Sequence, residues 1–332
     1  MRPSMKNSLL YYSTGALLYC PAHNETIVQS LVSEKFGSSF SLALCLEDTI
    51  NDDFVPEAEN KLIHSISMIY RYSESVQFFI PKIFIRVRNP EQIPSLLKRC
   101  GESAVLISGF IIPKFSPENA DRYTDTISEA NCTYKRNIYM LPILESLSIV
   151  NLQSRSETLY LLKEKLDSVE ELVLNIRVGG NDLCHIFGFR RHSDESIHNI
   201  TPIANIFSDI VTVFGMDYVI SGPVWEYYNG EHWSEGLRQE LRDDRLCGFT
   251  GKTVIHPNQI PYVNQAYKVT RKDYEDACSV LNWDMTSESF VSGNIFAERM
   301  NEFKTHSNWA EKILFLSKAY GIIDSEIYEP QP

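Results

Sequence analysis

The feature that most constrains the fold is an alternation of short apolar runs with longer segments of helical periodicity along most of the 332 residues. This pattern predicts strands that pair in parallel through crossover helices. Eight strands are expected, at Leu17–Ala22, Leu42–Glu47, Ile83–Val87, Gly109–Lys114, Ile138–Glu145, Glu171–Val178, Tyr218–Gly222 and Thr253–His256. Eight units fit a single α/β domain of the (β/α)₈ barrel type, although a doubly wound open sheet would alternate in a similar way.

Helix signals lie between the expected strands. The segment Pro56–Tyr72 has proline at its start and apolar residues on one face, and Ser116-Pro117-Glu118 is interpreted as a capped helix start. After about Ser279 we expect helical segments and no further strand. The chain is therefore divided into a barrel over residues 1–269 and a C-terminal helical extension over residues 270–332, which packs on the barrel or on a neighbouring subunit.

Charge and cysteine content exclude several classes of partner and site. The net charge of −12 argues against nucleic acid, because a phosphate backbone must be met by a surplus of Lys and Arg. The seven cysteines are odd in number and form no C-x-x-C pair, so neither a zinc site nor a disulfide framework is indicated. The apolar patch Leu9–Cys20 is too short and too polar to span a membrane. We expect a reduced, cytoplasmic protein with no nucleic-acid or membrane partner.

Polar residues gather where the expected strands end. In a barrel of this type the chemistry takes place at the carboxyl ends of the strands. Charged groups attached to apolar strands cost free energy unless they are paired or bind a ligand, so several of them at one end indicate a site. The candidates are Glu47, Asp48, Arg86, Arg88, Lys114, Glu145 and Asp182.

Glu145 and Asp182 are the pair best suited to a metal ion. They follow neighbouring expected strands, and their hard oxygen ligands favour Mg²⁺, with Mn²⁺ as the alternative. Gly179 and Gly180 precede Asp182 and allow the backbone to turn tightly and approach a ligand. The competing interpretation is two solvated surface carboxylates. We expect the metal role for the pair.

Three basic residues are candidates for substrate binding. The guanidinium of Arg86 can hold a carboxylate and oppose the charge that develops on an enolate oxygen, or it can form a salt bridge to Glu47 or Asp48. Arg88 has the same side-chain parity as Arg86, so it could point to the same face. For Lys114 an ion pair, an anion contact and a Schiff base are open, with the ion pair as the default.

Motifs in this order resemble the HpcH/HpaI aldolase/citrate lyase family, especially its citrate lyase beta-subunit-like members. Most of the seven motifs are weak alone, but together they run in the family's order from Leu17 to Ile260. The motifs are Leu17 to Pro21, Leu46-Glu47-Asp48, Arg86-Val87, Pro113-Lys114, Leu144-Glu145-Ser146, Gly179 to Leu183 and Gly251 to Ile260.

The resemblance implies a barrel of the phosphoenolpyruvate/pyruvate-binding type, oligomeric as a trimer or hexamer. It implies Mg²⁺ on Glu145 and Asp182, a substrate-binding Arg86, and a hydroxy acid, a 2-oxo acid or an acyl thioester as substrate. The sequence departs from the family pattern at Ala22, which follows Pro21 where glycine is usual, and at Arg88, where asparagine is usual. These departures suggest a divergent branch resembling the citrate-lyase-like proteins linked to tellurium-resistance clusters.

The expected activity is a metal-dependent carbon–carbon lyase or aldolase reaction through a stabilised enolate. Arg86 would act in catalysis, with Glu47 and Asp48 orienting it or an ordered water. The alternatives are a thioester hydrolase, a malate-synthase-like condensing enzyme and a catalytically silent binding or assembly subunit. Apolar residues spaced as in a helix from Phe296 to Tyr320 also suggest that the extension completes the active site, with Glu302 as an acid or base.

Overall fold

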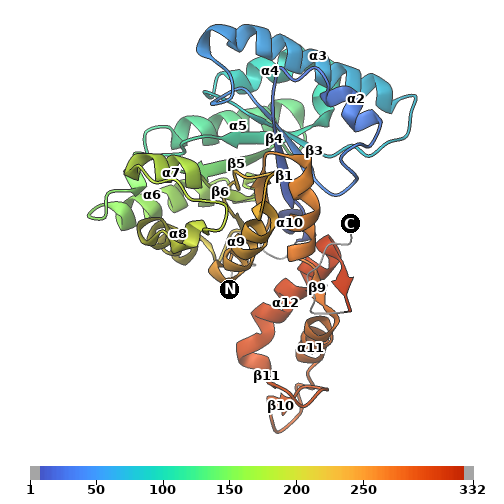
Figure 1. Ribbon diagram of the computed structural model, residues 1–332, viewed down its shortest axis with the longest axis vertical. Helices are drawn as coiled ribbons and strands as arrows, with labels where there is room; N and C mark the ends of the chain where they lie inside the picture. The colour runs from blue at the N-terminus through green and yellow to red at the C-terminus, as the bar shows by residue number, and fades with distance from the viewer. Residues whose placement is uncertain (1–7, 325–332) are drawn as a thin grey trace.

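The computed structural model describes residues 8–324, and in it eight parallel strands form a barrel (Figure 1). The strands are paired in the order β7-β6-β5-β4-β3-β2-β1-β8. Their bounds are β1 Ala16–Pro21, β2 Ser41–Cys45, β3 Lys82–Arg86, β4 Ile107–Ile112, β5 Tyr139–Leu144, β6 Ile176–Val178, β7 Ile220–Ser221 and β8 Lys252–Val254. The expected (β/α)₈ barrel is confirmed, and each expected strand overlaps one observed strand.

The barrel is closed between β7 and β8 by a parallel bridge that joins Gly222 to Lys252. Backbone hydrogen bonds support this join, since Gly222 N–H donates to Gly251 O over 3.0 Å and Thr250 N–H donates to Ile220 O over 2.7 Å. The seventh strand is shorter than the sequence predicts: the expected strand spans Tyr218–Gly222, whereas β7 spans only Ile220–Ser221.

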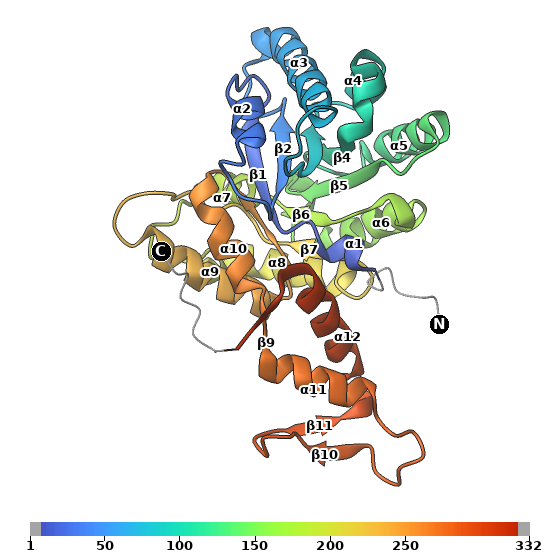
Figure 2. The same cartoon turned by 90° about the vertical axis from the view of Figure 1, so that its right-hand side faces the viewer.

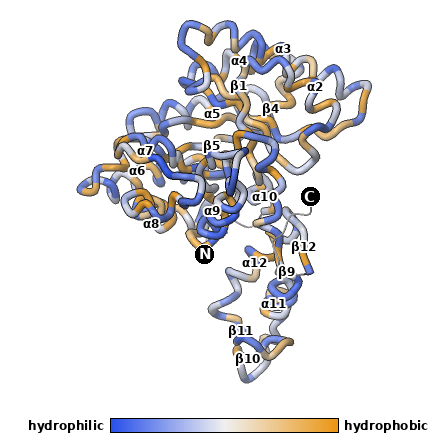
Figure 3. The backbone as a smooth tube through the Cα atoms, in the orientation of Figure 1, coloured by the Kyte–Doolittle hydropathy of each residue, from blue (hydrophilic) through white to orange (hydrophobic). Residues whose placement is uncertain are grey.

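Helices surround the sheet, and their bounds are α1 Leu9–Tyr12, α2 Ile27–Val32, α3 Val55–Ser73, α4 Gln92–Cys100, α5 Ala120–Tyr134, α6 Arg155–Asp167, α7 Gly180–Phe187, α8 Thr201–Phe214, α9 Trp233–Cys247 and α10 Ile260–Ala266. Helix α3 illustrates why they form. Pro56 stands in its first turn, where a missing N–H costs nothing, and Ala58, Leu62 and Ile66 are buried at helical spacing. Figure 3 shows hydrophobic and hydrophilic residues mixed along these outer helices, as expected for helices with one buried face.

The core has two parts, one on each face of the sheet. Outward-pointing strand residues such as Ile83 and Ile85 pack against the helices. Inward-pointing residues such as Leu17, Phe84 and Leu141 fill the barrel. Because the strands are buried on both faces, they have long apolar runs in the sequence, and a charged inward residue stands out against them.

Two local expectations were wrong. Helix α5 begins at Ala120, and the backbone N–H of Ser116 donates to the Asn119 side chain over 3.0 Å, so the Ser-Pro-Glu segment is a turn that precedes the helix. The expected sixth strand is also shorter, because Glu170–Leu172 forms a turn of 3-10 helix before β6. In both places local hydrogen bonds of polar side chains or backbone compete with the element expected from the pattern.

The C-terminal extension contains two helices and four short strands, so the expectation of helices alone was incomplete. Figure 2 shows it projecting from the barrel. Its elements are β9 Val269–Thr270, α11 Arg271–Leu281, β10 Val291–Gly293, β11 Met300–Glu302, α12 Phe303–Tyr320 and β12 Ile322–Ile323. Phe296 and Met300 belong to the β10–β11 hairpin region and not to α12, because the helix begins only at Phe303.

The extension packs at the amino end of the barrel strands. The ring of Phe315 stacks on Tyr12 with centroids 5.2 Å apart, and the Tyr320 hydroxyl donates to Tyr12 O over 3.1 Å. Tyr12 lies shortly before β1, so this contact is at the opposite end from residues that follow the strands. Among residues 8–324, no helix has the length and apolar character needed to cross a membrane.

Candidate active site

The carboxyl ends of the strands surround a cavity of about 380 Å³. Asp48 follows β2, Arg86 ends β3, Glu145 follows β5 and Asp182 lies in the first turn of α7, and all four line this cavity. The parallel arrangement brings together residues that are far apart in the sequence, because every strand of the barrel ends at the same rim. Glu47 and Lys114 contact the lining residues from β2 and β4.

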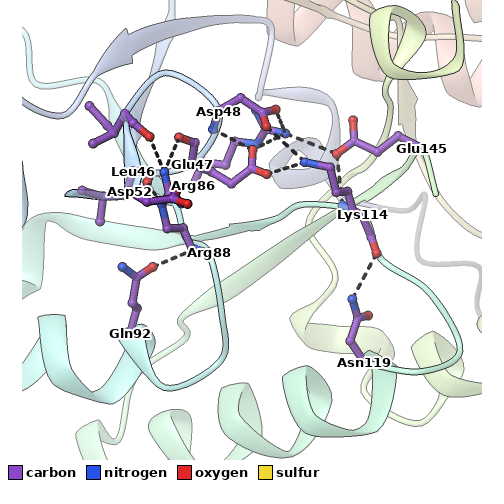
Figure 4. A network of polar contacts seen from close by, with 11 residues as sticks. Leu46, Glu47, Asp48, Asp52, Arg86, Arg88, Gln92, Lys114, Asn119 and Glu145 are labelled. Atoms are coloured by element: carbon purple, nitrogen blue, oxygen red, sulfur yellow. Dashed lines mark hydrogen bonds and ion pairs between the residues drawn. The ribbon is translucent and has the colours of Figure 1, made fainter. Parts of the chain in front are cut away.

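Arg86 is the centre of a buried ion-pair network, drawn in Figure 4. Its Nη2 lies 2.8 Å from Glu47 Oε2, 3.0 Å from Asp48 Oδ2 and 3.3 Å from Glu145 Oε1. Burial alone would lower the pKa of Arg86, but the neighbouring Tyr19, Glu145 and Glu47 outweigh it and raise that pKa. The expected salt bridge to Glu47 and Asp48 is therefore present, and the guanidinium lies at the cavity wall.

Lys114 forms the ion pair that was the default expectation. Its Nζ contacts Glu47 and lies 3.1 Å from Asp48 Oδ1. Burial alone would lower the pKa of Lys114. Hydrogen bonds and charge from Glu47 and Asp48 outweigh burial and raise this pKa above its ordinary value, so the amine stays protonated. A protonated amine is not the nucleophile that a Schiff base requires.

Glu145 is almost fully buried and is held from two sides. Its Oε1 accepts hydrogen bonds from Arg86 Nη2 over 3.3 Å and from the Lys114 backbone N–H over 3.0 Å. Burial raises the pKa of Glu145 to about 8, Arg86 opposes this shift, and the negative charge of Asp182 adds to it. The carboxyl groups of Glu145 and Asp182 therefore lie side by side, and burial disfavours the charged form of Glu145.

This donor set fits a magnesium ion. Glu145 and Asp182 offer hard oxygens, and the side of Glu145 Oε2 is bordered by Gly179, which has no side chain. No group of three or more His, Cys, Asp and Glu side chains in the described chain is arranged to hold a metal. Mg²⁺ is commonly held by one or two carboxylates, with water and substrate oxygens as its other ligands, so a two-carboxylate site suits this ion better than zinc.

Arg88 lies away from the cavity, although parity suggested the same face as Arg86. Its guanidinium donates to the backbone oxygens of Leu46 over 2.6 Å and Glu47 over 3.1 Å, and it contacts Asp52 and the oxygen of Ile50 (Figure 4). Strand β3 ends at Arg86, and beyond the end of a strand the alternation of sides no longer applies. Arg88 holds the loop that carries Glu47 and Asp48.

Tyr19, Arg177 and Thr253 are among the cavity residues that the sequence analysis did not single out. Arg177 could have been found by the reasoning applied to Arg86, since it stands between Ile176 and Val178 in an apolar strand. Tyr19 has the parity of the inward-facing Leu17 on β1, but an aromatic residue in a strand gives no sign of function.

The Gly251–Ile260 motif builds the wall beside the cavity. The Gln259 side chain donates to the backbone oxygens of Trp225 and Tyr227, both over 2.9 Å. Lys252 is fully buried and pairs with Glu240 and Asp244 on α9. His256 stacks on Tyr228 with ring centroids 4.8 Å apart.

Comparison with solved structures supports the same architecture. CitE from Mycobacterium tuberculosis, in complex with magnesium, acetoacetate and coenzyme A, is 17% identical with a TM-score of 0.59, over 93% of this chain and 99% of that one. The citrate lyase beta subunit from M. tuberculosis with oxaloacetate and magnesium is 18% identical, with a TM-score of 0.51 over 78% and 99% of the two chains. RipC from Yersinia pestis is 15% identical, with a TM-score of 0.52 over 79% and 98%. At these identities the likeness shows the fold.

No curated protein sequence matches the chain significantly. A family model described as C-C_Bond_Lyase of the TIM-Barrel fold matches residues 8–322. The match covers nearly the whole described chain and confirms the expected citrate-lyase-like resemblance. The chain therefore belongs to the C-C_Bond_Lyase family of the TIM-barrel fold.

Proposed function

We propose that this protein is a Mg²⁺-dependent lyase or aldolase that cleaves or forms a carbon–carbon bond beside the carboxylate of a small hydroxy or 2-oxo acid, free or as an acyl thioester. The observation that supports this most is the placement of Glu145 and Asp182 beside Arg86 in one cavity at the carboxyl ends of the strands. Family membership supports the class of bond. The structural neighbours that bind magnesium together with acetoacetate or oxaloacetate support the class of acid.

Each residue has a separate part in this chemistry. Glu145 and Asp182 would hold Mg²⁺, which supplies a positive charge that polarises a substrate oxygen. Arg86 would oppose the negative charge that develops on the substrate's enolate oxygen, because it is already fixed by its three carboxylate partners and needs little reorganisation. Glu47 and Asp48 orient Arg86 and Lys114.

The metal role is tested first by calorimetric titration with Mg²⁺. Asp182→Asn and Glu145→Gln each remove one anionic ligand, so both should weaken Mg²⁺ binding while the circular dichroism spectrum stays unchanged. Asp125→Asn, an exposed carboxylate on α5, is the matched control and should bind as the wild type does. Unchanged affinity in a folded Asp182→Asn protein would remove Asp182 from the proposed site.

The reaction is tested by incubating the protein and Mg²⁺ with a panel of hydroxy acids, 2-oxo acids and their coenzyme A esters, with products followed by mass spectrometry. A cleaved carbon–carbon bond that depends on Mg²⁺ and is lost in Glu145→Gln supports the proposal. Hydrolysis of the thioester alone would instead indicate a thioester hydrolase on the same site.

A further inference from the structure

Arg177 differs from the other buried basic side chains of the described structure. Five basic residues are buried, and four of them have carboxylate partners: Arg86, Arg155, Arg191 and Lys252. Arg177 is 1% exposed, and no carboxylate of the described residues forms an ion pair with it. A buried guanidinium without a counter-charge costs considerable free energy, so its retention needs a reason.

The neighbours of Arg177 are neutral. Its Nη1 donates to Asn175 Oδ1 over 3.1 Å and its Nη2 donates to Thr253 Oγ1 over 2.6 Å. Its Nε–H has no hydrogen-bond partner, and the phenol of Tyr19 lies beside it. Burial lowers the pKa of Arg177, whereas Tyr19, Glu145 and Glu47 outweigh burial and raise the pKa of Arg86. Arg86 and Arg177, the two buried arginines of the cavity, therefore have opposite electrostatic surroundings.

Arg177 lines the same 380 Å³ cavity as Glu145 and Asp182. It lies on β6, directly before the Gly179 turn that leads to Asp182. The side chain is thus held in place by two neutral hydrogen-bond acceptors, and its positive charge lies at the cavity without a carboxylate counter-charge among the described residues. A carboxylate is the matching group, because a guanidinium binds a planar anion through parallel hydrogen bonds.

We propose that Arg177 binds a second carboxylate of the substrate, so that the preferred ligand is a short dicarboxylic acid with one end at Glu145 and Asp182 and the other at Arg177. Only the binding of the first carboxylate, at Glu145 and Asp182, rests on the proposed function. Both ends of the acid would lie in the same cavity, and Thr253 and Tyr19 complete the polar surroundings of the second end.

The test compares malate with 2-hydroxybutyrate, which has the same carbon chain length and a methyl group in place of the second carboxylate. Calorimetry with Mg²⁺ gives the ratio of the two affinities. The wild type should prefer malate by about tenfold or more, and Arg177→Met should abolish the preference. Arg177→Met should also keep or raise the unfolding midpoint, because it removes a buried charge and leaves no carboxylate unpaired.

Arg155→Met is the matched control. Arg155 is also buried, but it lies outside the cavity and pairs with Asp209. This variant should lose stability and keep the preference for malate. Should Arg177→Met fail to fold, Arg177→Lys takes its place, and it should lower the preference because the ammonium does not form paired hydrogen bonds.

Three outcomes would overturn the inference: a wild type without a preference for malate, an Arg177 variant that keeps it, or tighter binding of inorganic phosphate than of malate. An Arg177-dependent preference that needs no Mg²⁺ would support the second carboxylate and refute the proposed metal site. The two proposals can therefore fail separately.

Discussion

Gly179 packs directly against the carboxylate of Glu145. A Cβ added at Gly179 would lie 1.9 Å from Glu145 Oε2 and 2.4 Å from Glu145 Cβ. The backbone of residue 179 has φ −95°, which any residue adopts, so glycine is required here for space. The turn after β6 therefore limits the position of the buried Glu145 carboxylate, which follows β5.

Gly179→Ala is expected to displace Glu145 and weaken Mg²⁺ binding by about tenfold or more, which corresponds to ~1.4 kcal/mol. Titration calorimetry measures the change. Gly293→Ala is the control, since no atom lies within 4 Å of the position of its added Cβ. Equal Mg²⁺ affinity in both variants would show that Glu145 is not a ligand.

Arg86→Met is expected to lower the free energy of unfolding by about 3–5 kcal/mol, because Glu145 would stay buried without its counter-charge. Urea unfolding followed by circular dichroism measures it. Arg122→Met removes the exposed pair with Glu91 and should cost no more than about 1 kcal/mol. A similar small loss for both variants would contradict the central place of Arg86 in the network.

The pH dependence of stability should change in His198→Gln. Burial lowers the pKa of His198, but its hydrogen bond to Asp244 Oδ1, 2.8 Å long, outweighs this and the pKa is raised to about 9. The stabilising charge is fully present below pH 6.5, the ordinary pKa of histidine, and is lost as the pH rises from 6.5 through the raised pKa of about 9. The wild-type stability should therefore fall more steeply than that of the variant across this range, as measured by urea unfolding at several pH values. Parallel curves would show that His198 does not titrate in this way.

The β10–β11 hairpin and the loop that precedes it present large apolar side chains to solvent, with Met285, Ile295 and Met300 exposed by 60%, 72% and 55%. We predict that the chain forms a homo-oligomer in which these residues contact a neighbouring subunit. Ile295→Asp with Met300→Asp should lower the mass measured by light scattering. Met216→Asp, on an equally exposed residue of the barrel, should not change it. A wild-type monomer would refute the prediction.

Glu302 ends β11 and directly precedes α12, and the extension contacts the amino end of its own barrel, opposite the cavity. If the extension completes an active site with Glu302 as an acid or base, the site must belong to a neighbouring subunit. Mixing inactive Glu302→Gln and Glu145→Gln proteins should then restore part of the activity. Mixtures that stay inactive, together with an active Glu302→Gln protein, would show that this residue has no catalytic part.

The alternation in the sequence was enough to predict eight parallel strands, and the polar residues that follow the apolar runs were enough to predict which end of the sheet bears the site. Strands buried on both faces require apolar runs, and charged residues that interrupt or follow these runs must lie at strand ends. Glu47, Asp48, Arg86, Lys114, Glu145 and Asp182 were found in this way, and the structure brings them to one rim.

Which arginines face the cavity depends on tertiary contacts that the sequence pattern does not show. Arg88 has the parity of Arg86 but follows the last residue of β3, so its direction depends on the loop it binds. Arg177 lies inside β6, and among the described residues its neighbours are neutral groups such as Tyr19 on β1 and Thr253 on β8. The sequence does not show that these residues lie beside it. The short strands of the extension were missed for a similar reason, because pairing with a distant segment stabilises them more than their own sequence does. Local patterns determine the elements, whereas the partner of each charged group is determined by contacts between segments far apart in the chain.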